Sequence, residues 1–334
     1  MYQSDTECHT VKQIEAHRRH TMNEITTVQR TDIVGADFIN EEMAQRWLTF
    51  LDATPKTVQT YTRSISQFVR WTKSKGIARP TADDIRAYRD ELAQDHKAST
   101  VNAYLMAVKQ LYKWLEEEGI SPNVAKNVKA IKLDSDTFKK DYLTTGQCKS
   151  LISGIDRTTL QGKRDYAICS LMLTTGMRDV EIQRANIEDL TTIGDFTALM
   201  YQGKGRHEKA KYKKIAPVVE DAIRDYLKTR GKADATEPLF ISTANRNYGE
   251  RMTTRSISRI VKTRLVNVGL DSNMLTAHSL RHTAATQNLL NGGSLEETQQ
   301  LLDHRDINTT LIYVHALERA NSQAEQRIAN AIFG

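Results

Sequence analysis

The chain has 334 residues, of which 39% are hydrophobic and 26% are charged, with a formal net charge of +6. This length predicts a large core and about two domains, and the composition is that of an ordinary soluble globular protein. Three widely spaced cysteines, Cys8, Cys148 and Cys169, argue against a disulfide framework or a zinc ribbon. The mild basic excess permits a polyanionic partner without requiring one.

The sequence contains no apolar run as long as a signal peptide core or a membrane span. Together with the cysteine usage, this predicts a cytoplasmic protein that enters no membrane. Residues 1–37 are polar and mixed in charge, without a sustained period, and we expect a disordered N-terminal extension.

Helical periodicity begins at Asn40, and residues 38–131 are predicted to form an all-α bundle. Thr54 followed by Pro55 starts the second helix, and Thr81 with Asp84 forms a capping box for the third. A fourth helix is expected from Ser99 to Gly119. Five basic residues fall outside the apolar stripes of these helices, as on a solvated face: Arg63, Arg70, Lys73, Lys109 and Lys113.

A charged segment without period, residues 132–141, is the predicted linker to a second domain at 142–334. A buried helix is expected at 164–173, and Arg178 and Glu181 open the next one, spaced like an ordinary surface ion pair. Residues 196–201 and 213–217 read as an antiparallel β-hairpin whose turn carries Lys204. The fold class is therefore mainly α, with a helical bundle followed by an α-rich domain that contains a small antiparallel sheet.

Two further helices are predicted around 219–228 and 256–268, with residues 238–241 between them as a short strand or a buried connection. In the second helix, the apolar residues Ile257, Ile260, Val261, Leu265 and Val268 face inward. Its basic residues are expected on an outer face: Arg255, Arg259, Lys262 and Arg264. The tail from 317 to 333 again has apolar residues at helical spacing.

Reactive side chains gather in residues 275–313. His278 and Arg281 are three positions apart, so they share one face of a helix that Gly292 and Gly293 should end. Ser294 with Glu297 forms a capping box for a second helix, with His304 just beyond its end. Tyr313 is then expected on a third helix that folds back towards His304.

This arrangement resembles the tyrosine recombinase, or phage integrase, family. The matching motif is His-x-x-Arg at His278 and Arg281, a later histidine at His304 and a tyrosine nine positions beyond it at Tyr313. Asp303 departs from the pattern, because the family usually has glycine before this histidine. The segment from Thr175 to Ile182, with Arg178 and Glu181, resembles the family's first arginine box.

The resemblance implies a site-specific DNA recombinase with six catalytic residues. Arg178, Arg281 and His304 would stabilise the charge on a phosphodiester, and Tyr313 would attack it to form a 3′-phosphotyrosine. Lys204 would be the general acid and His278 the general base, while Glu181 would hold Arg178. Neither ATP nor a metal would be needed.

The same resemblance implies double-stranded DNA recombination sites as partners, a homotetramer on DNA that passes through a Holliday junction, and possible accessory proteins. The first domain would bind one side of the duplex, and the C-terminal helix would dock on a neighbouring protomer. The motifs leave open the DNA sequence and whether the task is integration, excision, inversion or dimer resolution.

Other classes of protein remain open at this stage. A type IB topoisomerase uses similar chemistry, and a silent DNA-binding regulator would keep only the basic faces. A zinc enzyme is suggested by His278 and His282, four positions apart, but the glutamate of a His-Glu-x-x-His motif is missing and Arg281 would repel a cation.

Overall fold

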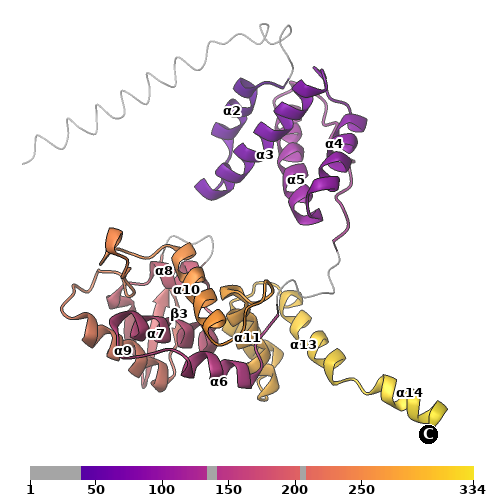
Figure 1. The fold of residues 1–334 in the computed structure, drawn as a ribbon. Coiled ribbons are helices and arrows are strands. Elements are labelled where there is room, and N and C mark those ends of the chain that lie inside the picture. Colours follow the sequence, from indigo (N-terminus) through magenta and orange to yellow (C-terminus); the bar gives the residue numbers. More distant parts are fainter. Residues whose placement is uncertain (1–38, 134–140, 204–207) are drawn as a thin grey trace, which may run out of the picture. The chain divides into compact units, whose positions relative to one another are not determined.

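The structure is a computed structural model that describes residues 39–133, 141–203 and 208–334. The chain divides into two compact units, Met1–Ser135 and Asp136–Gly334 (Figure 1). The predicted extension 1–37, most of the predicted linker 132–141, and Lys204 lie outside the described residues. The prediction of a mainly α fold with a small antiparallel sheet is confirmed.

The first unit contains the four predicted helices: α2 (Glu41–Phe50), α3 (Pro55–Ser74), α4 (Ala82–Asp95) and α5 (Ala98–Glu117). The predicted caps are present, because Thr54 accepts from the backbone at the start of α3, and Thr81 and Asp84 form a reciprocal capping box at the start of α4. The start of α5 at Ala98 has no side-chain cap. Capping signals therefore located the start of α3 and α4 from the sequence.

Large apolar side chains from all four helices form the core of this unit: Trp47, Phe68, Tyr88, Leu105, Leu111 and Tyr112 among them. The rings of Phe68 and Tyr88 lie edge to face, with centroids 4.9 Å apart. Asn102 bonds both the N–H and the carbonyl of Ile131, each at 2.8 Å, so the segment after α5 returns along this helix.

The second unit is built around α7 (Leu160–Thr175), which packs against α9 (Pro217–Arg230) and α11 (Ala277–Leu290). Its residues from Ala167 to Met172 are all buried, as expected of a central helix. The remaining helices are α6 (Thr145–Ser153), α8 (Asp179–Arg184), α10 (Thr254–Asn267), α12 (Leu295–Leu302), α13 (Asn308–Asn321) and α14 (Ala324–Phe333), with short 3₁₀ turns η2 (Ile187–Asp189) and η3 (Asn245–Asn247).

The sheet of this unit has three antiparallel strands in the order β1 (Leu190–Ile193), β2 (Phe196–Tyr201) and β3 (Lys211–Lys214). The predicted hairpin is β2 with β3, in which Tyr201 is opposite Lys211. Strand β1 was not predicted. Of the two readings of residues 238–241, the buried connection is correct, because only isolated bridges join its ends to other segments.

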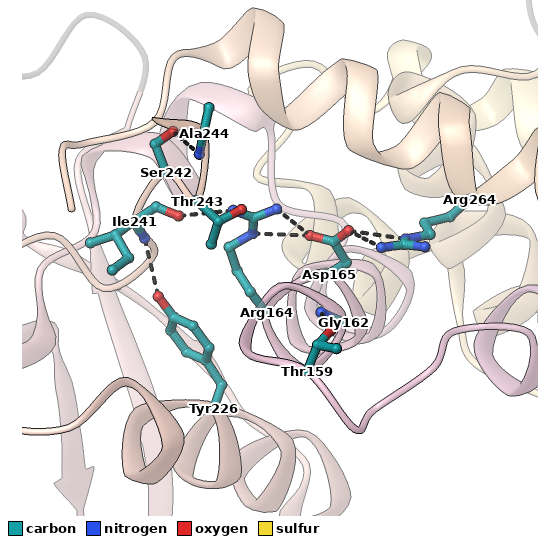
Figure 2. Close-up of polar contacts among 10 residues, drawn as sticks. All are labelled: Thr159, Gly162, Arg164, Asp165, Tyr226, Ile241, Ser242, Thr243, Ala244 and Arg264. Atoms are coloured by element: carbon teal, nitrogen blue, oxygen red, sulfur yellow. Dashed lines mark hydrogen bonds and ion pairs between the residues drawn. The ribbon is translucent and has the colours of Figure 1, made fainter. Parts of the chain in front are cut away.

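A buried network of charges joins α7 to α10 (Figure 2). The Asp165 carboxylate, 1% exposed, accepts from Arg164 at 2.9 Å and from Arg264 Nε at 2.9 Å. Arg164 also donates to the Ile241 carbonyl and to Thr243 Oγ1. The prediction of an outer-face position for Arg264 was wrong, because its side chain turns onto α7, where a carboxylate without bulk water needs compensating cations.

The C-terminal helix α14 buries none of its residues, and Figure 1 shows it in yellow beyond α13. Its apolar side chains Ile328, Ile332 and Phe333 are 59%, 66% and 86% exposed. Its predicted docking on a neighbouring protomer stays a prediction. Across the three described ranges, none of the helices has the length and apolarity of a bilayer span.

Candidate active site

Arg281 lies at the centre of the candidate site. It sits on α11, whose start is capped by Thr276 and Ser279, and it is 3% exposed. Its guanidinium donates to the Gly176 carbonyl at the end of α7 and to the Leu302 carbonyl at the end of α12. One buried side chain therefore links the segment before Arg178 to the segment before His304.

Gly176 permits this close approach. Its φ is 62°, a left-handed conformation that ends α7, and a Cβ built on it would lie 2.7 Å from Leu302 Cδ2. A larger residue would be strained in this conformation and would have to displace the Leu302 side chain. The glycine thus brings two segments that are far apart in the sequence to the same guanidinium.

Arg178 follows this turn and forms the N-cap of α8. Its NH1 donates to Glu181 Oε1 at 2.7 Å, and its backbone N–H donates to Oε2 at 2.8 Å. Glu181 is 2% exposed, whereas the Arg178 side chain is 27% exposed. The predicted pair is thus a buried carboxylate that orients a partly accessible guanidinium.

His304 lies in the turn between α12 and α13. Its Nδ1 is 2.9 Å from Thr310 Oγ1 on α13, and its backbone N–H donates to the Gln299 carbonyl. Burial, followed by the positive charges of Arg281 and Arg178, lowers the pKa of His304 to about 4. The imidazole is therefore neutral near pH 7, and the predicted return of the third helix towards it is confirmed.

Tyr313 is 3% exposed on α13, and its hydroxyl oxygen lies 2.8 Å from His282 Nδ1. Burial raises the pKa of Tyr313 to about 12, and burial together with His278 and Arg281 lowers the pKa of His282 to about 4. A protonated phenol therefore faces a neutral imidazole. The ring of His278 lies edge to face with that of His282 at 4.8 Å.

His282 is a residue that the sequence analysis considered only as a zinc ligand. The available signal was its position four residues after His278, which puts both rings on one face of α11. The role of His278 as general base stays a prediction. Within the described parts of the chain, no cluster of three or more His, Cys, Asp or Glu side chains is arranged to hold a metal ion.

Two lysines of β3 reach the end of α12, and neither was predicted as a site residue. Lys213 Nζ donates to the carbonyls of Gln300 and Leu301, and Lys211 forms an ion pair with Asp303. The residues differ by two in one strand, so their side chains leave the same face. The sequence offered no local signal, because each contact spans close to ninety residues of chain.

Burial lowers the pKa of Lys213 to about 8, with Glu181 opposing and Arg281 adding to the shift. The folded protein should thus release this proton above about pH 8, whereas the unfolded chain keeps it until about 10.5. Since the unfolded state then binds more protons, stability should rise with pH in this window. We expect the free energy of unfolding of the wild type, measured by urea denaturation relative to Lys213→Met, to increase by about 2 kcal/mol from pH 7 to 9.5. A flat or falling difference would contradict the prediction.

The described site residues therefore converge. Arg281 donates to the carbonyls of Gly176, two residues before Arg178, and of Leu302, which packs in one cluster with Tyr313. His278 joins them through α11 and His304 through the turn after Leu302. Of the six predicted catalytic residues, five lie in this part of the structure, and Lys204 is outside the described residues.

A basic cavity of about 550 Å³ opens beside this site, at the start of both α10 and α11. Thr253 and Thr276, the N-caps of the two helices, line it, so two positive helix-dipole ends face it. Arg246, Arg255 and Arg259 also line it, and within the described part of the chain their side chains form no ion pair. The cavity thus has the character of an anion-binding surface.

Comparison with known proteins agrees with this geometry. Residues 141–319 match the model of the phage integrase family, and residues 42–121 match the phage integrase N-terminal SAM-like domain. The chain belongs to the phage integrase family. The two matched segments correspond to the helical bundle α2–α5 and to the unit that carries Arg178, Arg281, His304 and Tyr313.

Relatives of this integrase-family chain include the tyrosine recombinase XerC of Caldanaerobacter subterraneus, 33% identical over 175 residues, which are 52% of this chain and 47% of the relative. The tyrosine recombinase XerD of Staphylococcus epidermidis is 33% identical over 186 residues, 52% of this chain and 58% of the relative. The chain thus matches about half the length of these relatives.

Solved structures show the same fold. One is the XerH site-specific recombinase bound to a palindromic difH substrate, with a TM-score of 0.65 and 19% identity, covering 82% of this chain and 78% of that one. Another is a lambda integrase (75–356) dimer bound to a COC′ core site, with a TM-score of 0.62 and 16% identity. The match covers 80% of this chain and 96% of that one.

Proposed function

We propose that this chain is a site-specific DNA recombinase that cleaves and rejoins DNA strands through a 3′-phosphotyrosine intermediate. The observation that carries the proposal is the convergence of a buried tyrosine, Tyr313, with two arginines and a neutral histidine at the ends of α7 and α12. Membership of the phage integrase family supports it, as do relatives named tyrosine recombinases.

The chemistry follows from the side chains. The Tyr313 oxygen forms a bond to phosphorus while the bond from phosphorus to the 5′-oxygen breaks, and the phenolic proton passes to His282 Nδ1, 2.8 Å away. The leaving 5′-oxygen takes a proton from a general acid, for which Lys204 remains the candidate. A 5′-hydroxyl from a second strand reverses the step, so rejoining needs no outside energy source.

The cations of the site would stabilise the charge that develops on the phosphate. Arg178 and Arg281 each present a planar fork of donors that suits two phosphate oxygens, and His304 adds a neutral donor. Arg281 is held by two carbonyls in the free protein, and Arg178 by Glu181, so both are oriented before DNA arrives. Lys213, buried behind them, adds positive charge.

We expect His282→Asn to slow formation of the covalent adduct by about 10²-fold, because the phenol loses its proton acceptor. The measurement is single-turnover cleavage of a nicked DNA substrate. His278→Asn is the variant to compare, because His278 lies on the same face of α11 and is the predicted general base. If His278→Asn slowed adduct formation more than His282→Asn, His278 and not His282 would be the general base.

DNA would lie across the basic surfaces of both units. In the second unit, the cavity with Arg255 and Arg259 is adjacent to the start of α11, which carries His278 and Arg281. In the first unit, Arg63 and Arg70 are exposed and form no ion pair within the described residues. Contacts of this kind to phosphates release counterions, so we expect binding to weaken steeply with salt.

Recombination of two duplexes requires four strand cleavages, so we propose a homotetramer on DNA that passes through a Holliday junction. The exposed apolar side chains of α14 support docking of this helix on a neighbouring protomer. Accessory DNA-bending or directionality proteins are compatible with this scheme. We therefore propose that the protein acts in the cytoplasm and is associated with the nucleoid when it is bound to DNA.

The test begins with the DNA site. Sequences that the full chain binds would be selected from a random duplex pool, and two copies would be placed on one supercoiled plasmid. We expect recombinant products in which the DNA between the sites is deleted or inverted. Relaxed plasmid without recombinants would indicate a topoisomerase, and binding without any strand cleavage would indicate a regulator.

A further inference from the structure

The residue before His304 has an unusual backbone conformation. Asp303 has φ 52° and ψ 46°, and it is the one non-glycine residue with positive φ among those that the structure describes. Left-handed backbone is unfavourable for a residue with a Cβ, so it persists only where surrounding contacts require it. Because His304 follows directly, the direction of its side chain depends on this turn.

Three cations hold the turn from outside. Arg281 donates to the Leu302 carbonyl, Lys213 to the Leu301 carbonyl, and Lys211 to the Asp303 carboxylate. The first two contacts are made to backbone carbonyls, so they do not depend on which residue stands at position 303. The contact of Lys211 is different, because it is made to the side chain whose own backbone is in the left-handed region.

The ion pair between Lys211 and Asp303 is partly buried, which strengthens it. The side chains of Lys211 and Asp303 are 32% and 23% exposed, so water screens them only in part. Burial raises the pKa of Asp303, but the hydrogen bond and charge of Lys211, with the charges of Lys213 and Arg178, lower it overall. The carboxylate therefore stays ionised and paired at neutral pH.

We propose that Lys211 and Asp303 are positioning residues, whose ion pair keeps the turn between α12 and α13 in its left-handed conformation and thereby sets where His304 lies. This inference rests on the proposed recombinase function of the same site. It assigns β3 a task in the reaction that is separate from contact with DNA. The physical reason is that a paired side chain compensates a backbone conformation that glycine would adopt without help.

The test is a double-mutant cycle with Lys211→Met and Asp303→Gly. We expect Lys211→Met alone to slow single-turnover cleavage about tenfold, because the turn loses its anchor. Asp303→Gly alone should stay within about threefold of the wild type, because glycine favours this φ. In the Asp303→Gly background, Lys211→Met should then have less than a twofold effect. Lys214→Met, which removes the neighbouring exposed lysine that lies over Phe196, is the matched control.

Several results would overturn the inference. An equal loss from Lys211→Met in both backgrounds would show that Lys211 acts on DNA directly. An unchanged cleavage rate for Lys211→Met in both backgrounds would show that the ion pair does not affect the reaction. A tenfold slower cleavage by Asp303→Gly alone would show that the carboxylate acts in another way. Thermal melting of each variant would exclude a general loss of folding.

A second readout does not depend on activity. The imidazole NMR signals of His304 should shift in Lys211→Met and return towards their wild-type positions in the double variant, while those of His282 stay in place. Unchanged His304 signals in Lys211→Met would overturn the inference even if the protein cleaves DNA. If the wild type forms no covalent adduct that depends on Tyr313, the proposed function fails, and the NMR cycle still decides the role of the ion pair.

Discussion

Tyr313→Phe is expected to abolish the covalent protein–DNA adduct, a loss of at least about 10⁴-fold in its rate of formation, because the variant lacks the attacking oxygen. The hydroxyl oxygen lies 2.8 Å from His282 Nδ1, and the ring of phenylalanine would stay buried, so the fold should survive. The measurement is denaturing gel electrophoresis of the protein with a nicked DNA substrate that prevents religation.

Tyr201→Phe is the matched control for this experiment. Tyr201 is another buried phenol, 3% exposed. The positive charge of Arg281 acts to lower the pKa of both tyrosines, and Arg178 adds to this effect at Tyr201. We expect its replacement to leave adduct formation within about tenfold of the wild type. If the adduct persisted in Tyr313→Phe and disappeared in Tyr201→Phe, the attacking residue would be Tyr201 and not Tyr313.

Arg178→Lys is expected to slow cleavage by about 10²- to 10³-fold, because lysine keeps the charge but loses the planar fork that binds two phosphate oxygens. Lysine is preferred to alanine here, since alanine would leave Glu181, 2% exposed, as an unpaired buried carboxylate. DNA affinity should change much less than the cleavage rate, because exposed basic residues elsewhere would supply most phosphate contacts.

The control is Arg184→Lys, at the exposed end of the same helix. It should leave both cleavage and melting temperature near wild-type values. If Arg178→Lys cleaved DNA at the wild-type rate, Arg178 would be a structural partner of Glu181 and nothing more. A parallel loss of cleavage and of melting temperature would point to the same conclusion.

Local signals account for most of what was predictable. The capping boxes at Thr81 and Ser294 appear where the sequence predicts them, because a cap involves residues only three positions apart. The buried character of α7 follows in the same way from its composition. The convergence of Arg281 and Tyr313 was expected from spacing and resemblance, and the structure brings them together.

Contacts between distant segments were not predictable in this way. Arg264 pairs with Asp165, ninety-nine positions away, and for that reason it does not lie on an outer face. His282 lies against the Tyr313 phenol, because the rotation of α11 against α13 is set by packing. Apart from strand β1, the predictions that failed or were absent thus concern the partner of a side chain and not the element that carries it.

The amino-acid order by itself determined which helices form, where several of them begin, and which reactive residues share a helix face, since caps and periodicity act over a few residues. Only the tertiary structure decided that β3 supplies Lys211 and Lys213 to the end of α12 and that Asp303 adopts left-handed backbone there. The physical reason is that such contacts exist only after chain folding brings together strands and helices that no local pattern connects.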